Sequence, residues 1–271
     1  MFSLRLICPA EEAELVSVYL WEQGTAGIRE QEAGAEIVLI AAFESDLTRG
    51  RLLNRFAHYQ PEWFEEESID WAEYVKSSWP AREVGDRLFL APAWSTAATP
   101  PGRHRVMHSP GLASGTGEHP CTLLALQALE RHSPNVARVV DIGTGSGILA
   151  IAALHLGAQE VLALDTDLEA LQVAQENFRL NGFKRPPLVA GSCNCLGADC
   201  STLTVANIDG TVLLSMFDDL LRVTSPNGRL ILTGFPEWEL AAFLNLLPGA
   251  AVSGMNEWRC LVSFPSEFPP P

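Results

Sequence analysis

Three glycines in the segment D-I-G-T-G-S-G, residues 141–147, stand at alternate positions. The segment follows an apolar stretch typical of a short strand and precedes a helical pattern. Glycines at such a turn let the backbone bend tightly and approach a ligand closely, and the helix N-terminus offers unpaired N–H groups. A turn with no ligand is the alternative. Gly143 and Gly145 are therefore candidates for contact with a nucleoside cofactor.

An acidic residue, Asp165, ends the next predicted strand, about 20 residues beyond the glycines. A carboxylate at this place can accept hydrogen bonds from both hydroxyls of a ribose. A helix cap is the alternative, but Asp167 is better placed for that role. Since no Lys or Arg flanks the glycine segment, the site does not suit a phosphate-rich ligand. This favours a cationic sulfonium cofactor over a nicotinamide one.

A third polar residue, Asn207, follows the predicted strand Leu203–Ala206. Ligands of open α/β sheets bind at the carboxyl ends of the strands. The amide oxygen of Asn207 can accept a hydrogen bond from an amine and so aim the nitrogen lone pair at a methyl group. An ordinary turn residue is the alternative. We expect Asn207 to be the catalytic residue.

The glycine motif resembles motif I of the class I S-adenosylmethionine-dependent methyltransferases. A longer stretch, P-G-L-A-S-G-T-G-E-H-P-C-T at 110–122, resembles the P-G-L-A-F-G-T-G-T-H-P-T-T signature of the ribosomal methyltransferase family PrmA, whose members modify the eleventh protein of the large subunit. Later stretches at 141–151, 163–167, 205–208 and 228–234 resemble the same family, as do parts of 71–94. The resemblance covers nearly the whole chain.

The resemblance implies that S-adenosyl-L-methionine is the cofactor and that lysine or N-terminal amines of a basic ribosomal protein are the substrate. The loop at 114–116 would cover the methionine end of the cofactor. The site residues that the resemblance and the motifs imply are Gly115, Thr116, Thr122, Gly143, Gly145, Asp165 and Asn207.

Three departures from the family signature concern the substrate more than the cofactor. Ser114 replaces a Phe, Cys121 replaces a Thr, and Asp209-Gly210 stand where Leu-Ala is usual. Asp209 could accept the proton of the incoming amine or attract its positive charge. A helix-capping role for Asp209 is equally compatible with the sequence.

The candidate site residues must be held in place by larger parts of the fold. From residue 138 onward strands and helices alternate, which is typical of a parallel sheet with crossover helices. We therefore expect a Rossmann-like class I methyltransferase domain over 110–271. Residues 1–67 show the order β-α-β-β-α-β, a small ferredoxin-like α+β domain, and the resemblance makes it the substrate-recognition domain. Residues 68–109, rich in Trp and Pro, form a connector.

Composition limits the classes of function. The 271 residues are 47% hydrophobic and 19% charged, which is typical of a globular protein of about two domains. The net charge of −15 would repel nucleic acid and suits a basic protein partner, although many enzymes are acidic for solubility alone. No membrane span, export signal or metal-binding cysteine pattern is recognised. A cytoplasmic monomer is expected.

Other functions stay open from the sequence. A related protein-lysine methyltransferase could act on another target, such as an electron-transfer flavoprotein subunit, but the N-terminal domain favours the ribosomal substrate. The departures Ser114 and Asp209 are compatible with a non-catalytic module that binds S-adenosylmethionine. A nicotinamide-dependent oxidoreductase is disfavoured by the glycine spacing.

Overall fold

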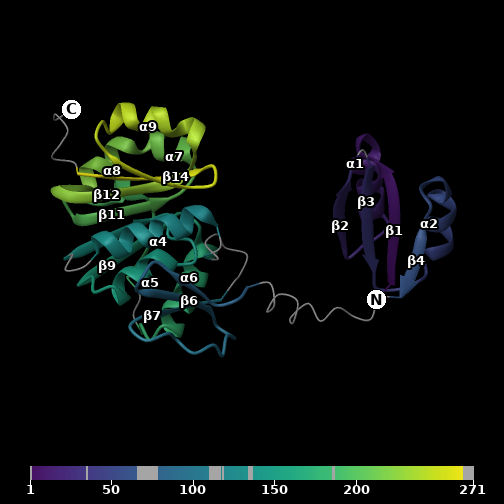
Figure 1. Ribbon diagram of the computed structural model, residues 1–271, viewed down its shortest axis with the longest axis horizontal. Helices are drawn as coiled ribbons and strands as arrows, with labels where there is room; N and C mark the ends of the chain where they lie inside the picture. The colour runs from purple at the N-terminus through teal and green to yellow at the C-terminus, as the bar shows by residue number, and fades with distance from the viewer. Residues whose placement is uncertain are drawn as a thin grey trace. The chain divides into compact units, whose positions relative to one another are not determined.

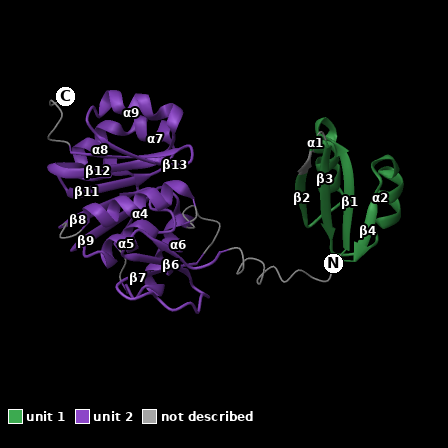
Figure 2. Cartoon of the chain, in the orientation of Figure 1, with its two compact units in different colours: residues 1–78 green, residues 79–271 purple. Residues whose placement is uncertain are grey.

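The computed structural model describes residues 2–34, 36–65, 79–109, 117, 119–133, 137–184 and 187–264 (Figure 1). The chain divides into two compact units, residues 1–78 and 79–271 (Figure 2). Residues 66–78, which include the first part of the expected connector, lie outside the described residues. The domain boundaries at 67 and 109 therefore stay predictions.

The first unit is a four-stranded antiparallel sheet with its strands in the order β2-β3-β1-β4. This order, with a helix after β1 and another after β3, is the ferredoxin-like arrangement that the sequence predicts. The elements are β1 (Phe2–Pro9), α1 (Ala10–Glu22), β2 (Gly27–Ala33), β3 (Glu36–Phe43), α2 (Arg49–Arg55) and β4 (Glu62–Glu65).

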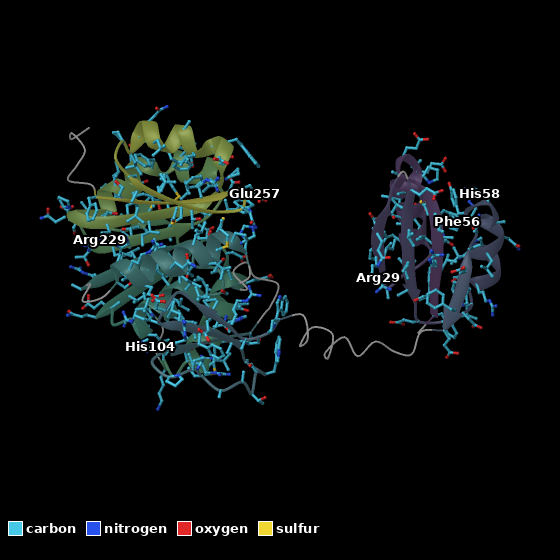
Figure 3. The ribbon with its side chains drawn as sticks, in the orientation of Figure 1. Arg29, Phe56, His58, His104, Arg229 and Glu257 are labelled. Carbon is cyan, nitrogen blue, oxygen red and sulfur yellow. The ribbon has the colours of Figure 1, made fainter. Side chains whose placement is uncertain are left out.

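A separate hydrophobic core holds the first unit together. Leu4, Leu6 and Cys8 alternate along β1 and are fully buried, because every second residue of a strand points to the same face of the sheet. Phe56, labelled in Figure 3, is buried at the end of α2 and contacts the edge of the Tyr19 ring at 5.5 Å. The unit can thus bury apolar side chains without help from the rest of the chain.

The second unit is built on a seven-stranded sheet in the order β10-β9-β8-β11-β12-β14-β13. Strands β8 to β12 run parallel, and β14 runs antiparallel to both of its neighbours. The strands are β8 (Arg138–Ile142), β9 (Glu160–Asp165), β10 (Leu188–Ala190), β11 (Ser201–Asn207), β12 (Thr224–Pro236), β13 (Ala251–Met255) and β14 (Trp258–Ser263).

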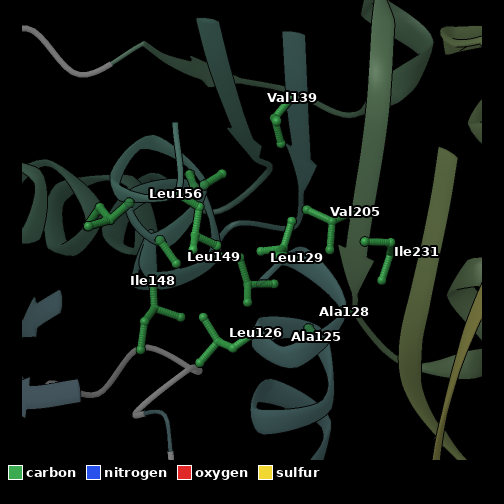
Figure 4. Close-up of a cluster of buried hydrophobic side chains, with 14 of the residues drawn as sticks. Ala125, Leu126, Ala128, Leu129, Val139, Ile148, Leu149, Leu156, Val205 and Ile231 are labelled. Carbon is green, nitrogen blue, oxygen red and sulfur yellow. The ribbon is translucent and has the colours of Figure 1, made fainter. Parts of the chain in front are cut away.

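The connecting helices cover both faces of this sheet, so strand residues are buried on both sides. Val139, Val205 and Ile231 pack against one layer of helices, α4 to α6, as the close-up in Figure 4 shows for part of that core. Ala206 and Leu232 pack against the other layer, α7 to α9. The helices are α4 (Pro120–His132), α5 (Ile148–His155), α6 (Leu168–Leu180), α7 (Gly210–Ser215), α8 (Phe217–Val223) and α9 (Leu240–Leu246).

Strands β8 and β11 are neighbours although β9 and β10 come between them in the sequence. The connections after β8 and β11 therefore lead in opposite directions across the sheet. In open α/β sheets a crevice forms at this switch point, beyond the carboxyl ends of the strands. The fold thus opens a ligand site next to the glycine segment and Asn207.

A small sheet of three strands joins the second unit through apolar contacts. It consists of β5 (Arg82–Val84), β6 (Leu88–Pro92) and β7 (His104–His108). Leu88, Leu90 and Val106 are buried in the same core as helices α4 and α5. Residues 82–108, expected to be part of a connector, are thus packed on the second unit.

Within the described part of the chain, no helix is long and apolar enough to cross a membrane.

Candidate functional site

A cavity of about 630 Å³ lies at the carboxyl edge of the large sheet. Four of the predicted site residues line it: Gly143 and Gly145 after β8, Asp165 at the end of β9, and Asn207 at the end of β11. These residues lie far apart in the sequence. Parallel strands bring them together because their carboxyl ends meet at one edge of the sheet.

The other predicted residues have different positions. Thr122 is buried on α4 behind the cavity, and its Oγ1 accepts a hydrogen bond from Asn207 Nδ2 at 3.2 Å. Gly115 and Thr116, together with Ser114, lie outside the described residues. Their predicted contact with the cofactor stays a prediction.

The glycine segment has the left-handed backbone that explains its composition. Gly143, Gly145 and Gly147 have φ angles of 68°, 52° and 80°, values that residues with a Cβ atom rarely adopt. A Cβ at Gly143 would also overlap the Cγ2 methyl of Ile208. Glycine at this position therefore allows the loop after β8 to lie against the turn after β11.

Asp165 joins the loop of β8 to the start of α6. Its Oδ2 accepts a hydrogen bond from Gly145 N at 2.8 Å, and its Oδ1 accepts one from Asp167 N at 3.0 Å. Asp167 caps α6 through Glu169 N at 2.8 Å, as the sequence predicts. Because a carboxylate has about four acceptor sites, Asp165 can still accept hydrogen bonds from ligand hydroxyls.

Asp141, the acidic residue before the glycines, is fully buried. Its Oδ2 accepts hydrogen bonds from Thr144 Oγ1 at 2.7 Å and from Ala150 N at 3.2 Å. The pKa of this carboxyl is raised to about 7, chiefly by burial; the two hydrogen bonds act to lower it, and the negative charge of Asp165 acts to raise it. Asp141 thus fastens the glycine loop to the first turns of α5.

The turn after β11 depends on a second glycine contact. Gly234 has a φ of 106°, and a Cβ there would overlap the carbonyl of Ile208. Asp209 caps α7, since its Oδ1 accepts from Thr211 N at 2.9 Å and from Val212 N at 3.4 Å. Asp209 also lines the cavity. Its suggested action on the amine stays a prediction beside the capping role seen here.

Two aromatic residues of the cavity wall were not singled out as site residues from the sequence. His119 caps α4, its Nδ1 accepting from Cys121 N at 3.3 Å, and its ring meets the Trp258 ring edge-on at 4.6 Å. Trp258 begins β14, whose antiparallel direction pairs it with Pro236 at the end of β12. In the sequence Trp258 is an ordinary strand residue, and only this pairing reveals its place in the cavity.

The cavity is acidic. Asp165, Asp167 and Asp209 line it, and no Lys or Arg is found among its described lining residues. Such a wall attracts a cation and repels phosphate. In the described part of the chain, no group of three or more His, Cys, Asp or Glu residues is arranged to hold a metal ion.

Comparison with known proteins identifies a family that matches most of this chain. The family described as "Ribosomal protein L11 methyltransferase (PrmA)" matches residues 52–262. The chain belongs to this family. Membership confirms the predicted family, the Rossmann-like methyltransferase fold and the methyltransferase activity, with S-adenosylmethionine as the methyl donor.

Individual relatives match most of this chain. A ribosomal protein L11 methyltransferase of Symbiobacterium thermophilum is 35% identical over 83% of this chain and 71% of its own. One of Syntrophotalea carbinolica is 30% identical over 95% of this chain and 96% of its own. The crystal structure of a ribosomal protein L11 methylase from Lactobacillus delbrueckii is 30% identical, with a TM-score of 0.62 over 68% of this chain and 97% of that one.

Proposed function

We propose that this protein transfers methyl groups from S-adenosylmethionine to lysine or N-terminal amines of ribosomal protein L11. The names of the PrmA relatives support this substrate. The observation that carries the chemistry is the hydrogen bond from Asn207 Nδ2 to Thr122 Oγ1. It orients the amide of Asn207 so that Oδ1 is available to hold an amine at the cavity.

The cavity residues fit the cofactor. When bound, S-adenosylmethionine supplies an electrophilic methyl group on a positively charged sulfur. Asp165 would accept hydrogen bonds from the ribose hydroxyls, and the backbone of Gly143 and Gly145 would allow close approach of the nucleoside. The carboxylates that line the cavity would favour a positively charged ligand.

The chain must also deliver a neutral amine. A lysine ammonium has no lone pair, and its ordinary pKa of about 10.4 keeps it protonated at neutral pH. Transfer out of water and a sulfonium bound nearby would both lower that pKa, so that the ammonium can release its proton to water before the methyl group passes to the nitrogen and S-adenosylhomocysteine leaves. Asn207 Oδ1 would then accept a hydrogen bond from the amine N–H and direct the lone pair, while the rings of His119 and Trp258 line the same cavity.

The first unit fits the role of substrate recognition. It folds around its own core, and the acidic charge of the chain suits a basic ribosomal protein. As part of the same proposal, the protein acts as a cytoplasmic monomer and contacts neither nucleic acid nor membrane directly.

A mass-spectrometric assay tests the proposal. The full chain is incubated with methyl-labelled S-adenosylmethionine and ribosomal proteins that have not been methylated. We expect label on ribosomal protein L11 and far less label with the Asn207→Ala variant. Label on another protein would contradict the substrate, and binding of the cofactor without label on any protein would contradict the activity.

A further inference from the structure

One buried amide on α6 connects the chain at Ser109 with the glycine segment, whose Gly143 and Gly145 line the cavity. Asn177 is 1% exposed. Its Oδ1 accepts a hydrogen bond from Ser109 N at 2.8 Å, and its Nδ2 donates one to Ser146 O at 2.9 Å. Ser109 directly precedes the signature at 110–122, and Ser146 lies within the glycine segment. Neither contact was predicted from the sequence.

The contact with Ser146 acts within the glycine segment. Ser146 stands between Gly145 and Gly147, both in left-handed conformation. Glycines have many accessible conformations, so holding one loop conformation costs entropy. A hydrogen bond to Ser146 O restricts the peptide that joins Ser146 to Gly147. The loop is thereby ordered before a ligand arrives, which lowers the cost of binding.

Helix α6 is packed tightly enough to make this bond a fixed one. A Cβ at Gly147 would lie 3.2 Å from the Cβ of Ala174 and 3.2 Å from the ring of Phe178. These two residues flank Asn177 on α6, and both are fully buried. The end of the glycine loop therefore rests directly on the helix turn that carries Asn177.

A second amide one turn later provides a natural comparison. Asn181 Oδ1 accepts from Met107 N at 2.8 Å, and Asn181 Nδ2 donates to Met107 O at 2.7 Å. Asn181 thus holds β7 on the helix in the same way that Asn177 holds Ser109. No hydrogen bond described for Asn181 reaches the glycine segment.

We propose that Asn177 is a positioning residue for the cofactor: it fixes the glycine loop at Ser146 and aligns it with the chain at Ser109. An amide is needed because one side chain must donate to a carbonyl and accept from an N–H at the same time. This inference depends on the proposed function in one respect: both take S-adenosylmethionine to be the ligand of this loop.

The test compares Asn177→Asp with Asn181→Asp. Each substitution keeps the acceptor and the side-chain volume but removes the donated hydrogen bonds. Isothermal calorimetry with S-adenosylhomocysteine measures affinity, and thermal unfolding measures stability. We expect both variants to be destabilised, but only Asn177→Asp to raise the dissociation constant, by about tenfold, the equivalent of 1.4 kcal/mol. In turnover assays its KM for S-adenosylmethionine rises by a similar factor while kcat changes little.

A second measurement does not depend on a ligand. Amide hydrogen exchange at residues 145–148 should be faster in Asn177→Asp than in Asn181→Asp, because only the first loses the bond to Ser146. If Asn177→Asp fails to fold, Asn177→Ala carries the same expectation without introducing a charge. Equal dissociation constants and equal exchange in both variants would overturn the inference. Failure of the unaltered protein to bind S-adenosylhomocysteine would instead count against the proposed function.

Discussion

At the scale of single residues, the amide of Asn207 is the group whose orientation matters most for the chemistry. Its Nδ2 is fixed by Thr122, and Oδ1 is the atom that we assign to the amine. We expect Asn207→Ala to lower kcat by about 100-fold, a typical loss when one preorganised hydrogen bond at the reacting atoms is removed. Single-turnover kinetics at saturating cofactor measures this effect.

Thr122→Val is the matched change for that experiment, since it removes only the partner of Nδ2. It should lower kcat less than Asn207→Ala does, because the amide loses its orientation but not its oxygen. A Thr122→Val variant as slow as Asn207→Ala would show that the hydroxyl itself, rather than the amide, does the chemistry.

Asp141 makes the stability of the protein depend on pH. Its pKa is raised to about 7 in the folded protein, above its ordinary value of 3.8. Between these two values the folded state binds more protons at this carboxyl than the unfolded state does, so the Asp141 contribution to stability falls as pH rises from about 4 to about 7. We expect thermal unfolding of Asp141→Asn to lack this component of the pH dependence.

Asp141→Asn is suited to this comparison because the amide oxygen of the new side chain can still accept hydrogen bonds from Thr144 Oγ1 and Ala150 N. Stability is measured for both proteins across the same pH range, and the difference isolates Asp141 from other titrating groups. Parallel curves for the two proteins would mean that Asp141 has the same pKa in the folded and the unfolded state, which would contradict the prediction.

At the scale of elements, the contact between two loops explains why glycine is needed after β8. Gly143→Ala introduces both an unfavourable φ and an overlap with Ile208. The φ alone costs about 1–3 kcal/mol. We expect a lower unfolding temperature and weaker binding of S-adenosylhomocysteine, because the loop or the turn carrying Asn207 must move.

Gly157→Ala is the control for that change. Gly157 has a φ of 102°, but a Cβ there would meet nothing within 4 Å. It should therefore lower stability without changing cofactor affinity. Similar losses of affinity in both variants would show that the overlap with Ile208 is unimportant.

The elements also show how far sequence reasoning reaches. The sequence predicts the place of the glycine turn, Asp165 and Asn207 in one site. This is possible because the carboxyl ends of parallel strands meet at one edge of the sheet, whatever the details of side-chain packing. His119 and Trp258 were not, since their meeting depends on the antiparallel return of β14. The spacing of apolar residues can indicate a strand, but it does not reveal which distant strand will pair with it.

Helix α1 shows a second limit. In the sequence, Leu15, Val18 and Tyr19 share a face at helical spacing, which would predict a stripe that faces the core. Tyr19 packs partly against the core, but Leu15 is 74% and Val18 52% exposed. The buried face carries Val16 and Leu20 instead. Both sets fit the helical period, so only the packing against the sheet decides which one is buried.

At the scale of the whole molecule, the two units have separate hydrophobic cores. All of the described residues that line the cavity belong to 79–271. We therefore expect a fragment of residues 79–271 to bind S-adenosylhomocysteine with nearly unchanged affinity. Its kcat/KM for ribosomal protein L11 should fall by at least about tenfold, because the unit proposed to hold the substrate is lost.

The fragment is compared with the full chain by calorimetry and by the methylation assay. Methylation of a short lysine peptide should be affected little, since a peptide is too small to need the first unit. Equal kcat/KM of the fragment and the full chain for the whole ribosomal protein would refute the assigned role of residues 1–78.

The pairing of Trp258 with Pro236 has a consequence for how the protein is made. Chains fold from the N-terminus as they leave the ribosome, and the glycine loop and Asp165 emerge long before β14. A growing chain can therefore shape the part of the cavity lined by Gly145 and Asp165 early, but the aromatic wall is completed only after β14 has been synthesised. A chain that ends before β14 would lack Trp258 and its contact with His119, so the complete cavity depends on a strand made long after the glycine loop.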